Sequence, residues 1–81
     1  MAKVLLFGRL AEIAGWRERA FDPAPARLSD LRELIGRLDP DLAAALAGLG
    51  VRAAIDKEMV IGDAAIPPGA EVAFMPPMSG G

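Results

Sequence analysis

The feature that most constrains the fold is one strongly amphipathic segment in the middle of the chain. Leucine and isoleucine recur there at the spacing of a single helix face, at Leu28, Leu31, Leu34, Ile35 and Leu38. Ser29 is expected to cap this helix, and Asp30 would lie in its first turn, where a negative charge opposes the helix dipole. A helix with one apolar face needs a second layer to cover that face, which favours a helix packed on a sheet.

Short strand-like runs lie on both sides of this helix. Their residues are apolar or alternate between apolar and polar, as in Lys3–Arg9, Trp16–Phe21, Val51–Ile55, Met59–Ile61 and Glu71–Met75. Turn-forming pairs such as Gly62-Asp63 separate them. The two terminal runs could pair with each other at the centre of a sheet.

Two shorter helical segments complete the pattern. Leu10–Ala14 is a brief helix-forming stretch, and a second short helix is expected with Asp39 as cap and Pro40 at its first position. The residues expected to line that helix are Leu42, Leu46 and Leu49. We therefore predict an α+β chain, with a mixed sheet of about four to five strands packed on one main helix plus a short second helix. Residues 1–75 would form a single domain, and residues 76–81 an extended C-terminal tail.

The composition excludes most catalytic chemistry. The sequence has no His, Cys, Tyr, Asn, Gln or Thr, and its two hydroxyl side chains are Ser29 and Ser79. Ser–His and Cys–His nucleophiles therefore cannot form, and the usual zinc ligands are absent. The isolated chain is expected not to be an enzyme, to have no metal site and to bind no cofactor of its own.

Charge and hydropathy narrow the class of partner. A net charge of −2 lacks the basic footprint of nucleic-acid binding. The longest uncharged stretches, 42–51 and 72–81, reach about half of the length that spans a bilayer. We expect no nucleic-acid partner and no membrane segment, and a cytoplasmic location.

The chemically distinctive segment is the end of the chain. Pro76-Pro77 favours a stiff, extended backbone, whereas Gly80-Gly81 has no side chains and can enter a narrow channel. A stiff spacer with a slender tip suits delivery of the Gly81 α-carboxylate into the active site of another protein. Spacing alone leaves open the alternative that the segment is only a frayed, solvated end.

The same segment carries a family resemblance. The run EVAFMPPMSGG, residues 71–81, resembles the C-terminus of the molybdopterin synthase small subunit, the MoaD family of sulfur carriers. The start of the chain, residues 4–15, resembles the family's first strand and the helical segment after it, and residues 53–56 resemble its short central strand. Ala70, Met75 and Asp56 depart from the residues that are usual in the family.

The resemblance implies a β-grasp, ubiquitin-like fold and a reaction cycle shared with partners. An E1-like, MoeB-like adenylating enzyme, which uses ATP and Mg²⁺, would adenylate Gly81. Sulfur would replace AMP to give a thiocarboxylate. The tail would then enter the MoaE-like large subunit of molybdopterin synthase and donate sulfur to a pterin precursor of the molybdenum cofactor.

The site residues that follow are the tail and the residues flanking it. Gly81, preceded by Gly80, would carry the reactive carboxylate, and the expected partner interface is Phe74, Met75, Pro76, Pro77, Met78 and Ser79. Either Phe74 or Met75 would face the core, because neighbouring residues of a strand point to opposite sides. Arg9, Arg17, Arg19 and Arg52 are expected to form a solvated surface, with steering of an acidic partner as the alternative.

The sequence leaves two alternative classes of function open. The chain could be a ThiS-like or tRNA-thiolation sulfur carrier, because one thiocarboxylate can serve several pathways. It could also be a ubiquitin-like protein modifier or a plain interaction module.

Overall fold

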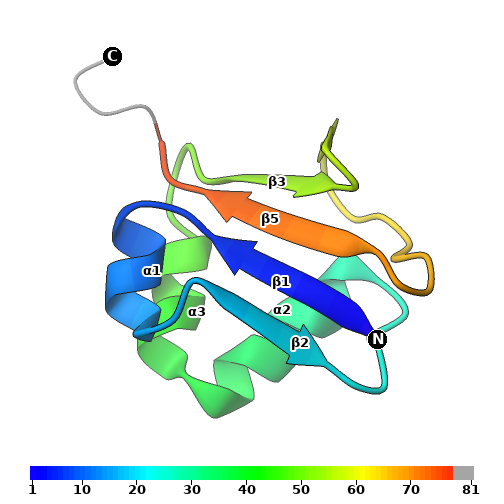
Figure 1. Cartoon of the computed structure of the whole chain (residues 1–81). Coiled ribbons are helices and arrows are strands. Elements are labelled where there is room, and N and C mark those ends of the chain that lie inside the picture. Colours follow the sequence, from blue (N-terminus) through cyan, green and yellow to red (C-terminus); the bar gives the residue numbers. More distant parts are fainter. Residues whose placement is uncertain (78–81) are drawn as a thin grey trace.

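The computed structural model describes residues 1–77, in which five strands form one mixed sheet (Figure 1). The strands are β1 (Ala2–Leu6), β2 (Glu18–Phe21), β3 (Arg52–Ile55), β4 (Glu58–Val60) and β5 (Glu71–Met75). Their order across the sheet is β2-β1-β5-β3-β4. The β1–β5 pair is parallel and the other pairs are antiparallel. The two terminal strands therefore lie side by side at the centre of the sheet.

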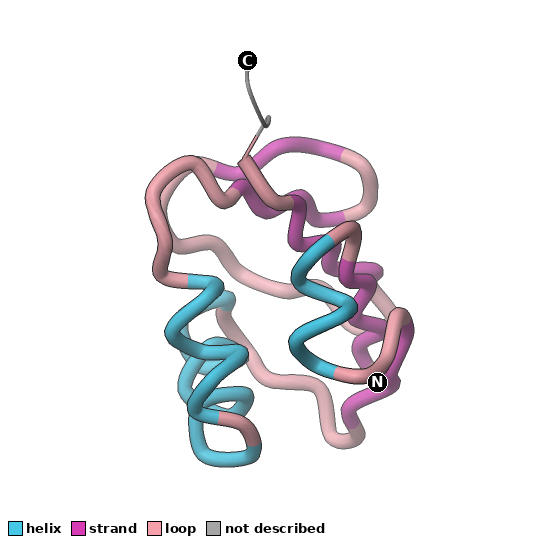
Figure 2. Tube along the Cα trace, turned by 90° about the vertical axis from the view of Figure 1, so that its left-hand side faces the viewer, coloured by secondary structure: helices cyan, strands magenta, loops and turns pink. Residues whose placement is uncertain are grey.

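The helices gather on one side of the strands, as the view in Figure 2 shows. They are α1 (Arg9–Ala14), α2 (Leu28–Leu38) and α3 (Pro40–Leu46). The main helix, α2, buries Leu28, Leu31 and Ile35, as its apolar spacing predicted. Asp39 caps α3 by accepting a hydrogen bond from the Leu42 N–H at 3.1 Å. This α+β architecture is the β-grasp fold, and the prediction of the fold class is confirmed.

The core lies between the helices and one face of the two central strands. Val4 and Leu6 of β1 alternate with less buried neighbours, and Val72 and Phe74 of β5 do the same. Phe74 has no exposed surface, and the guanidinium carbon of Arg32 lies 5.2 Å from its ring centroid. Full burial of one such apolar side chain contributes about 1.5–3 kcal/mol to the free energy of folding. Core packing of Val72 and Phe74 and pairing with β1 and β3 therefore both hold β5 in place.

The capping role expected of Ser29 is wrong. Helix α2 begins one residue earlier, at Leu28, and its N-cap is Arg27, which makes no side-chain capping bond. The acceptor comes instead from the loop after β4. Asp63 accepts hydrogen bonds from the Ser29 N–H at 2.9 Å and from the Ser29 Oγ at 3.0 Å. A carboxylate distant in sequence thus performs the local capping task.

Several element boundaries also differ from the prediction. The first strand ends at Leu6, because Gly8 has a φ of 55° that no strand adopts and Arg9 begins α1. The second strand begins at Glu18 rather than Trp16. Helix α3 ends at Leu46, so Leu49 does not line it and is 97% exposed. Ile61 lies just beyond β4 and is also 97% exposed.

The β3–β4 hairpin turns at Asp56 and Lys57, and both residues have positive φ. This conformation is the one that two-residue hairpin loops require. Asp56 also bridges to β5, because its Oδ1 accepts a hydrogen bond from the Glu71 N–H at 3.0 Å. Asp56 thus has a structural role in this turn, but the asparagine that is common in the family could accept the same hydrogen bond.

Candidate functional site

The candidate site is the place where the chain leaves the sheet after β5. The Phe7 N–H donates a hydrogen bond to the Phe74 carbonyl at 3.2 Å, and Met75 pairs with Arg52 of β3. Pro76 and Pro77 follow, and neither has an amide hydrogen to donate. Sheet pairing therefore stops at Met75, and the chain departs from the end of the central strand (Figure 1).

A mostly apolar hollow of about 250 Å³ lies beside this exit. Its walls come from α1, α3, the α3–β3 loop and the two prolines. Its lining residues are Arg9, Leu10, Ile13, Ala45, Gly48, Leu49, Val51, Pro76 and Pro77. Leu49 is almost fully exposed, so apolar surface lies next to the segment that leads to the tail.

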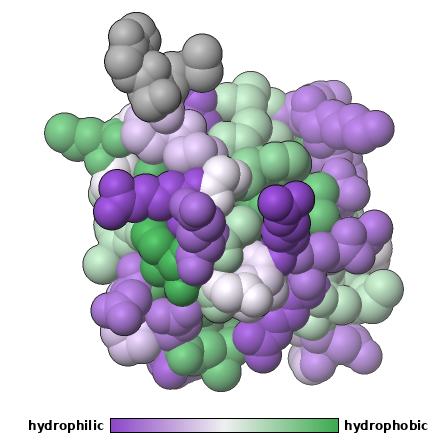
Figure 3. All heavy atoms as spheres, turned by 60° about the vertical axis from the view of Figure 1, so that its left-hand side comes forward, coloured by the Kyte–Doolittle hydropathy of each residue, from purple (hydrophilic) through white to green (hydrophobic). Residues whose placement is uncertain are grey.

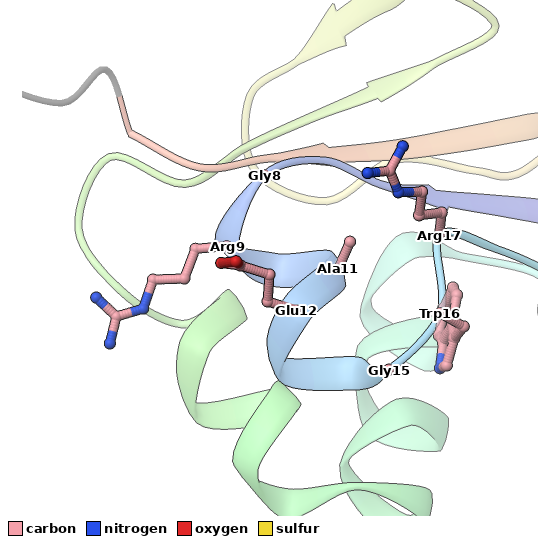
Figure 4. Close-up of a pocket in the computed structure, with 7 residues that line it drawn as sticks. All are labelled: Gly8, Arg9, Ala11, Glu12, Gly15, Trp16 and Arg17. Carbon is pink, nitrogen blue, oxygen red and sulfur yellow. The ribbon is translucent and has the colours of Figure 1, made fainter.

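A more polar hollow of about 440 Å³ lies along α1 and the turn after it (Figure 4). Arg9 and Arg17 stand at its two sides, and Glu12 lies on α1 between them. Figure 4 shows that the Arg9 side chain extends away from Arg17, so the two guanidinium groups do not converge on one ligand. This hollow supplies charge close to the tail exit without forming an anion site.

The sheet face opposite the helices is largely apolar near its centre. One cross-strand row runs from Leu5 through Ala73 and Ala54 to Met59. Met59 is 54% exposed, and Phe7, directly after β1, is 47% exposed. On the side that carries α1 and α3, apolar and hydrophilic groups are interspersed (Figure 3). The open sheet face thus carries one apolar row, which ends at the exposed Met59.

The predicted interface residues differ in how exposed they are in the structure. Phe74 is fully buried, so its expected place on the partner interface is wrong, and Phe74 belongs to the core. Met75 and Pro76 are half-buried, and Pro77 is exposed. The predicted residues Met78, Ser79, Gly80 and Gly81 lie outside the described residues.

The arginines singled out in the sequence lie on the surface. Arg9, Arg17, Arg19 and Arg52 are all exposed. The guanidinium carbon of Arg19 lies 5.2 Å from the ring centroid of Phe21 and 6.0 Å from that of Trp16. Arg19 therefore packs over Trp16 and Phe21, and this contact is structural.

The strongest electrostatic effect lies away from the exit, at the start of α2. The Arg27 Nε donates to Asp63 Oδ2 at 2.8 Å. Hydrogen bonds from Arg27 and then from the Ser29 N–H hold the pKa of Asp63 well below its usual range. The same partner raises the pKa of Arg27. Both groups are partly exposed, so this contact fastens the β4–β5 loop to α2 and leaves the tail untouched.

Two glycines at the exit have roles that sequence reasoning missed. Gly8 and Gly50 are the residues against which Pro76 and Pro77 pack. The sequence indicates only that these glycines lie at the ends of elements, because a glycine in a turn does not reveal which distant residue packs against it. Within residues 1–77, no group of three or more metal-ligating side chains is found, and no helix is long and apolar enough to cross a bilayer.

The topology and the exit define the class of protein. A mixed β-grasp sheet whose central last strand leads directly into the C-terminal tail is a ubiquitin-like architecture. The model of the ThiS family matches residues 4–81, and the chain belongs to this family of ubiquitin-like sulfur carriers and modifiers.

Solved structures agree with this family. SAMP1 from Haloferax volcanii is 28% identical with a TM-score of 0.84, over 99% of this chain and 98% of that chain. The H. volcanii small archaeal modifier protein 1, in a second crystal structure, is 25% identical with a TM-score of 0.82, over 95% and 97% of the two chains. No curated protein matches the chain significantly.

Proposed function

We propose that this chain is the sulfur carrier of molybdenum cofactor biosynthesis and that its reactive group is the Gly81 α-carboxylate. The observation that carries the proposal is the continuity between β5 and the sequence FMPPMSGG, residues 74–81. The strand is fixed at the centre of the sheet, and its end passes directly into the Pro-Pro spacer and the Gly-Gly tip. The chain would act with its catalytic side chains, ATP and Mg²⁺ all supplied by partners in the cytoplasm.

Conversion of the Gly81 carboxylate to a thiocarboxylate would take two steps. The Gly81 carboxylate attacks the α-phosphorus of ATP, which gives an acyl-adenylate and releases pyrophosphate. Hydrosulfide then displaces AMP at the acyl carbon and leaves a C-terminal thiocarboxylate, with no change in the oxidation state of carbon. The thiocarboxylate would donate its sulfur to a pterin precursor inside the large subunit of molybdopterin synthase, and water would attack the acyl carbon as the C–S bond breaks, which restores the Gly81 carboxylate.

Intact-mass spectrometry tests the first part of the proposal. The chain is incubated with the cognate adenylating enzyme, ATP, Mg²⁺ and sulfide, and its mass should rise by the difference between one sulfur and one oxygen atom. A chain lacking Gly81 should show no gain, and Glu33→Gln, on the exposed side of α2, serves as a control that keeps the whole tail. An unchanged mass with an enzyme that thiocarboxylates another carrier would overturn the proposal.

The choice of pathway needs a second measurement. The thiocarboxylated chain, mixed with a molybdopterin synthase large subunit, should form a stable complex and convert the pterin precursor to a dithiolene product. Sulfur transfer to thiazole or tRNA substrates, with no transfer to the pterin, would assign the carrier to one of those pathways instead.

A protein modifier is the second candidate, and the similarity to structures of small archaeal modifier proteins favours it. In that reaction a lysine ε-amine displaces the leaving group at the Gly81 acyl carbon, and an isopeptide bond forms. Peptides with a Ser-Gly-Gly remnant on lysine after cyanogen bromide cleavage at Met78, found in cells expressing the wild type and lost with the chain lacking Gly81, would identify this activity.

A further inference from the structure

The two prolines that begin the tail each lie against a glycine from a different loop. Gly8 comes directly before α1, and a Cβ built on it would lie 3.1 Å from the Pro76 Cγ. Gly50 precedes Val51 and β3, and a Cβ built there would lie 2.7 Å from the Pro77 Cβ. Carbon atoms in good contact are about 3.5–4.0 Å apart. At Gly50 a side chain would therefore displace Pro77.

The surroundings determine how such a displacement would be absorbed. On the upstream side, β5 cannot shift easily, because Phe74 is fully buried and Met75 pairs with Arg52. The proline rings fix φ near −65°, which removes one of the two backbone rotations by which each of Pro76 and Pro77 could otherwise yield. The position of Pro77 thus sets the start of the segment that continues to Gly81.

We propose that Gly50 and Gly8 are positioning residues for the tail, and that the absence of a side chain at Gly50 sets the direction in which the tail leaves the domain. This inference rests on the proposed function, because it concerns delivery of the Gly81 carboxylate to an adenylating enzyme. A misplacement of about 1 Å at a reacting group can lower a rate about 100-fold. Gly8 lies next to the departing segment in Figure 4, on the α1 side of the exit.

The chain offers a matched control for the backbone strain that alanine would add. Gly50 has a φ of 83° and Gly69 has a φ of 75°, so both positions favour glycine for conformational reasons. A Cβ on Gly69 would have no atom within 4 Å, and Gly69 lies before β5, at the opposite end of that strand from the tail. The two alanine variants therefore share the strain and differ in the contact with Pro77.

The test measures ATP–pyrophosphate exchange with the cognate adenylating enzyme as the concentration of the carrier is varied. Gly50→Ala should lower kcat/KM about tenfold or more relative to Gly69→Ala. The value of kcat should also fall. A smaller folded fraction of the carrier would raise KM but leave kcat unchanged, because kcat is measured at a saturating concentration of the carrier. The melting temperatures of the two variants should be similar. In the double variant Gly50→Ala/Pro77→Gly, which removes the clashing Cβ, exchange should return to the level of Pro77→Gly alone.

The outcomes separate the inference from the proposed function. No exchange with the wild-type chain, by an enzyme active on another carrier, overturns the proposed function. Wild-type exchange with equal kcat/KM for Gly50→Ala and Gly69→Ala, or a double variant that is not rescued, overturns the positioning role. If Gly50→Ala does not fold, Gly50→Asn and Gly69→Asn replace the pair, because asparagine tolerates positive φ and still carries a Cβ.

Discussion

Asp63 and Arg27 form an ion pair across 36 residues of sequence, with the Arg27 Nε donating to Asp63 Oδ2 at 2.8 Å. The same carboxylate accepts from the backbone and the hydroxyl of Ser29. The long loop between β4 and β5 is thereby fastened to the first turn of α2. Since β5 must enter the centre of the sheet directly after this loop, the contact also helps to set where β5 begins.

The first prediction concerns the pH dependence of stability. The pKa of Asp63 is lower in the folded chain than in the unfolded chain, so its contribution is fully present above the unfolded value of about 4. The contribution is lost as the pH falls from there through the folded pKa. Asp63→Asn should therefore be less stable than the wild type at pH 7, and the difference should shrink at pH 3. Urea unfolding at both pH values measures this.

A carboxylate on the exposed side of α2 provides the control. Glu33→Gln also removes one negative charge, but Glu33 forms no ion pair with another described residue. Its stability difference from the wild type should change less between pH 7 and pH 3 than that of Asp63→Asn. A constant difference for Asp63→Asn would contradict the assignment.

The second prediction concerns the β3–β4 turn. Lys57 has a φ of 70°. This backbone conformation is unfavourable for a residue with a Cβ and nearly free of strain for glycine. Lys57→Gly should raise the free energy of unfolding by about 0.5–1 kcal/mol. The melting temperature should rise with it, since each kcal/mol corresponds to roughly 4–8 °C in a domain of this size. Lys57→Ala keeps the Cβ and should give no gain. Equal stabilisation by both variants would point to the lost charge instead.

The third prediction separates the core from the surface at the end of β5. Phe74→Ala should cost about 3–5 kcal/mol, a large share of the 5–15 kcal/mol that stabilises a typical domain. Met75→Ala, at the next and half-exposed position, should cost about 1 kcal/mol or less. Chemical denaturation measures both. Similar losses for the two variants would show that Met75 also belongs to the core.

The fourth prediction concerns the open face of the sheet, and it rests on the proposed function. Met59→Ser should raise the KM for the adenylating enzyme about fivefold to tenfold, which corresponds to about 1 kcal/mol of lost contact. Leu38→Ser is the matched control, because Leu38 is 53% exposed but lies at the end of α2, on the helix side. Calorimetry of both variants verifies that the fold is retained. Equal effects on KM would show that Met59 does not contact the adenylating enzyme.

The sequence predicts the elements of this fold well because each follows from a local pattern. The apolar spacing of α2, the Asp39-Pro40 start of α3 and the strand-like run of β5 all depend on neighbours along the chain. For the pairing of β1 with β5 the sequence indicates only a possibility, because the hydrogen bonds between these strands join residues far apart in sequence.

The features that the sequence missed depend on tertiary contacts. Ser29 carries the signature of a cap, but Asp63 does the capping, since a distant carboxylate reaches the same donors. The packing of Pro77 on Gly50 depends on how two loops meet at the end of the sheet. Phe74 and Met75 are both large and apolar, so only the pleat of the strand decides which one is buried.

The central position of β5 has a consequence for the synthesis of the chain on the ribosome. Without β5, the sheet consists of two separate antiparallel ladders, β1 with β2 and β3 with β4. Ribosomes deliver the chain from its N-terminus, so the strand that joins the two ladders emerges last of the five. The sheet is thus completed by the same segment that leads into the tail. Placement of Pro76 and Pro77 against Gly8 and Gly50 therefore depends on a completed sheet, so an enzyme that requires this placement would discriminate against released chains that have not folded.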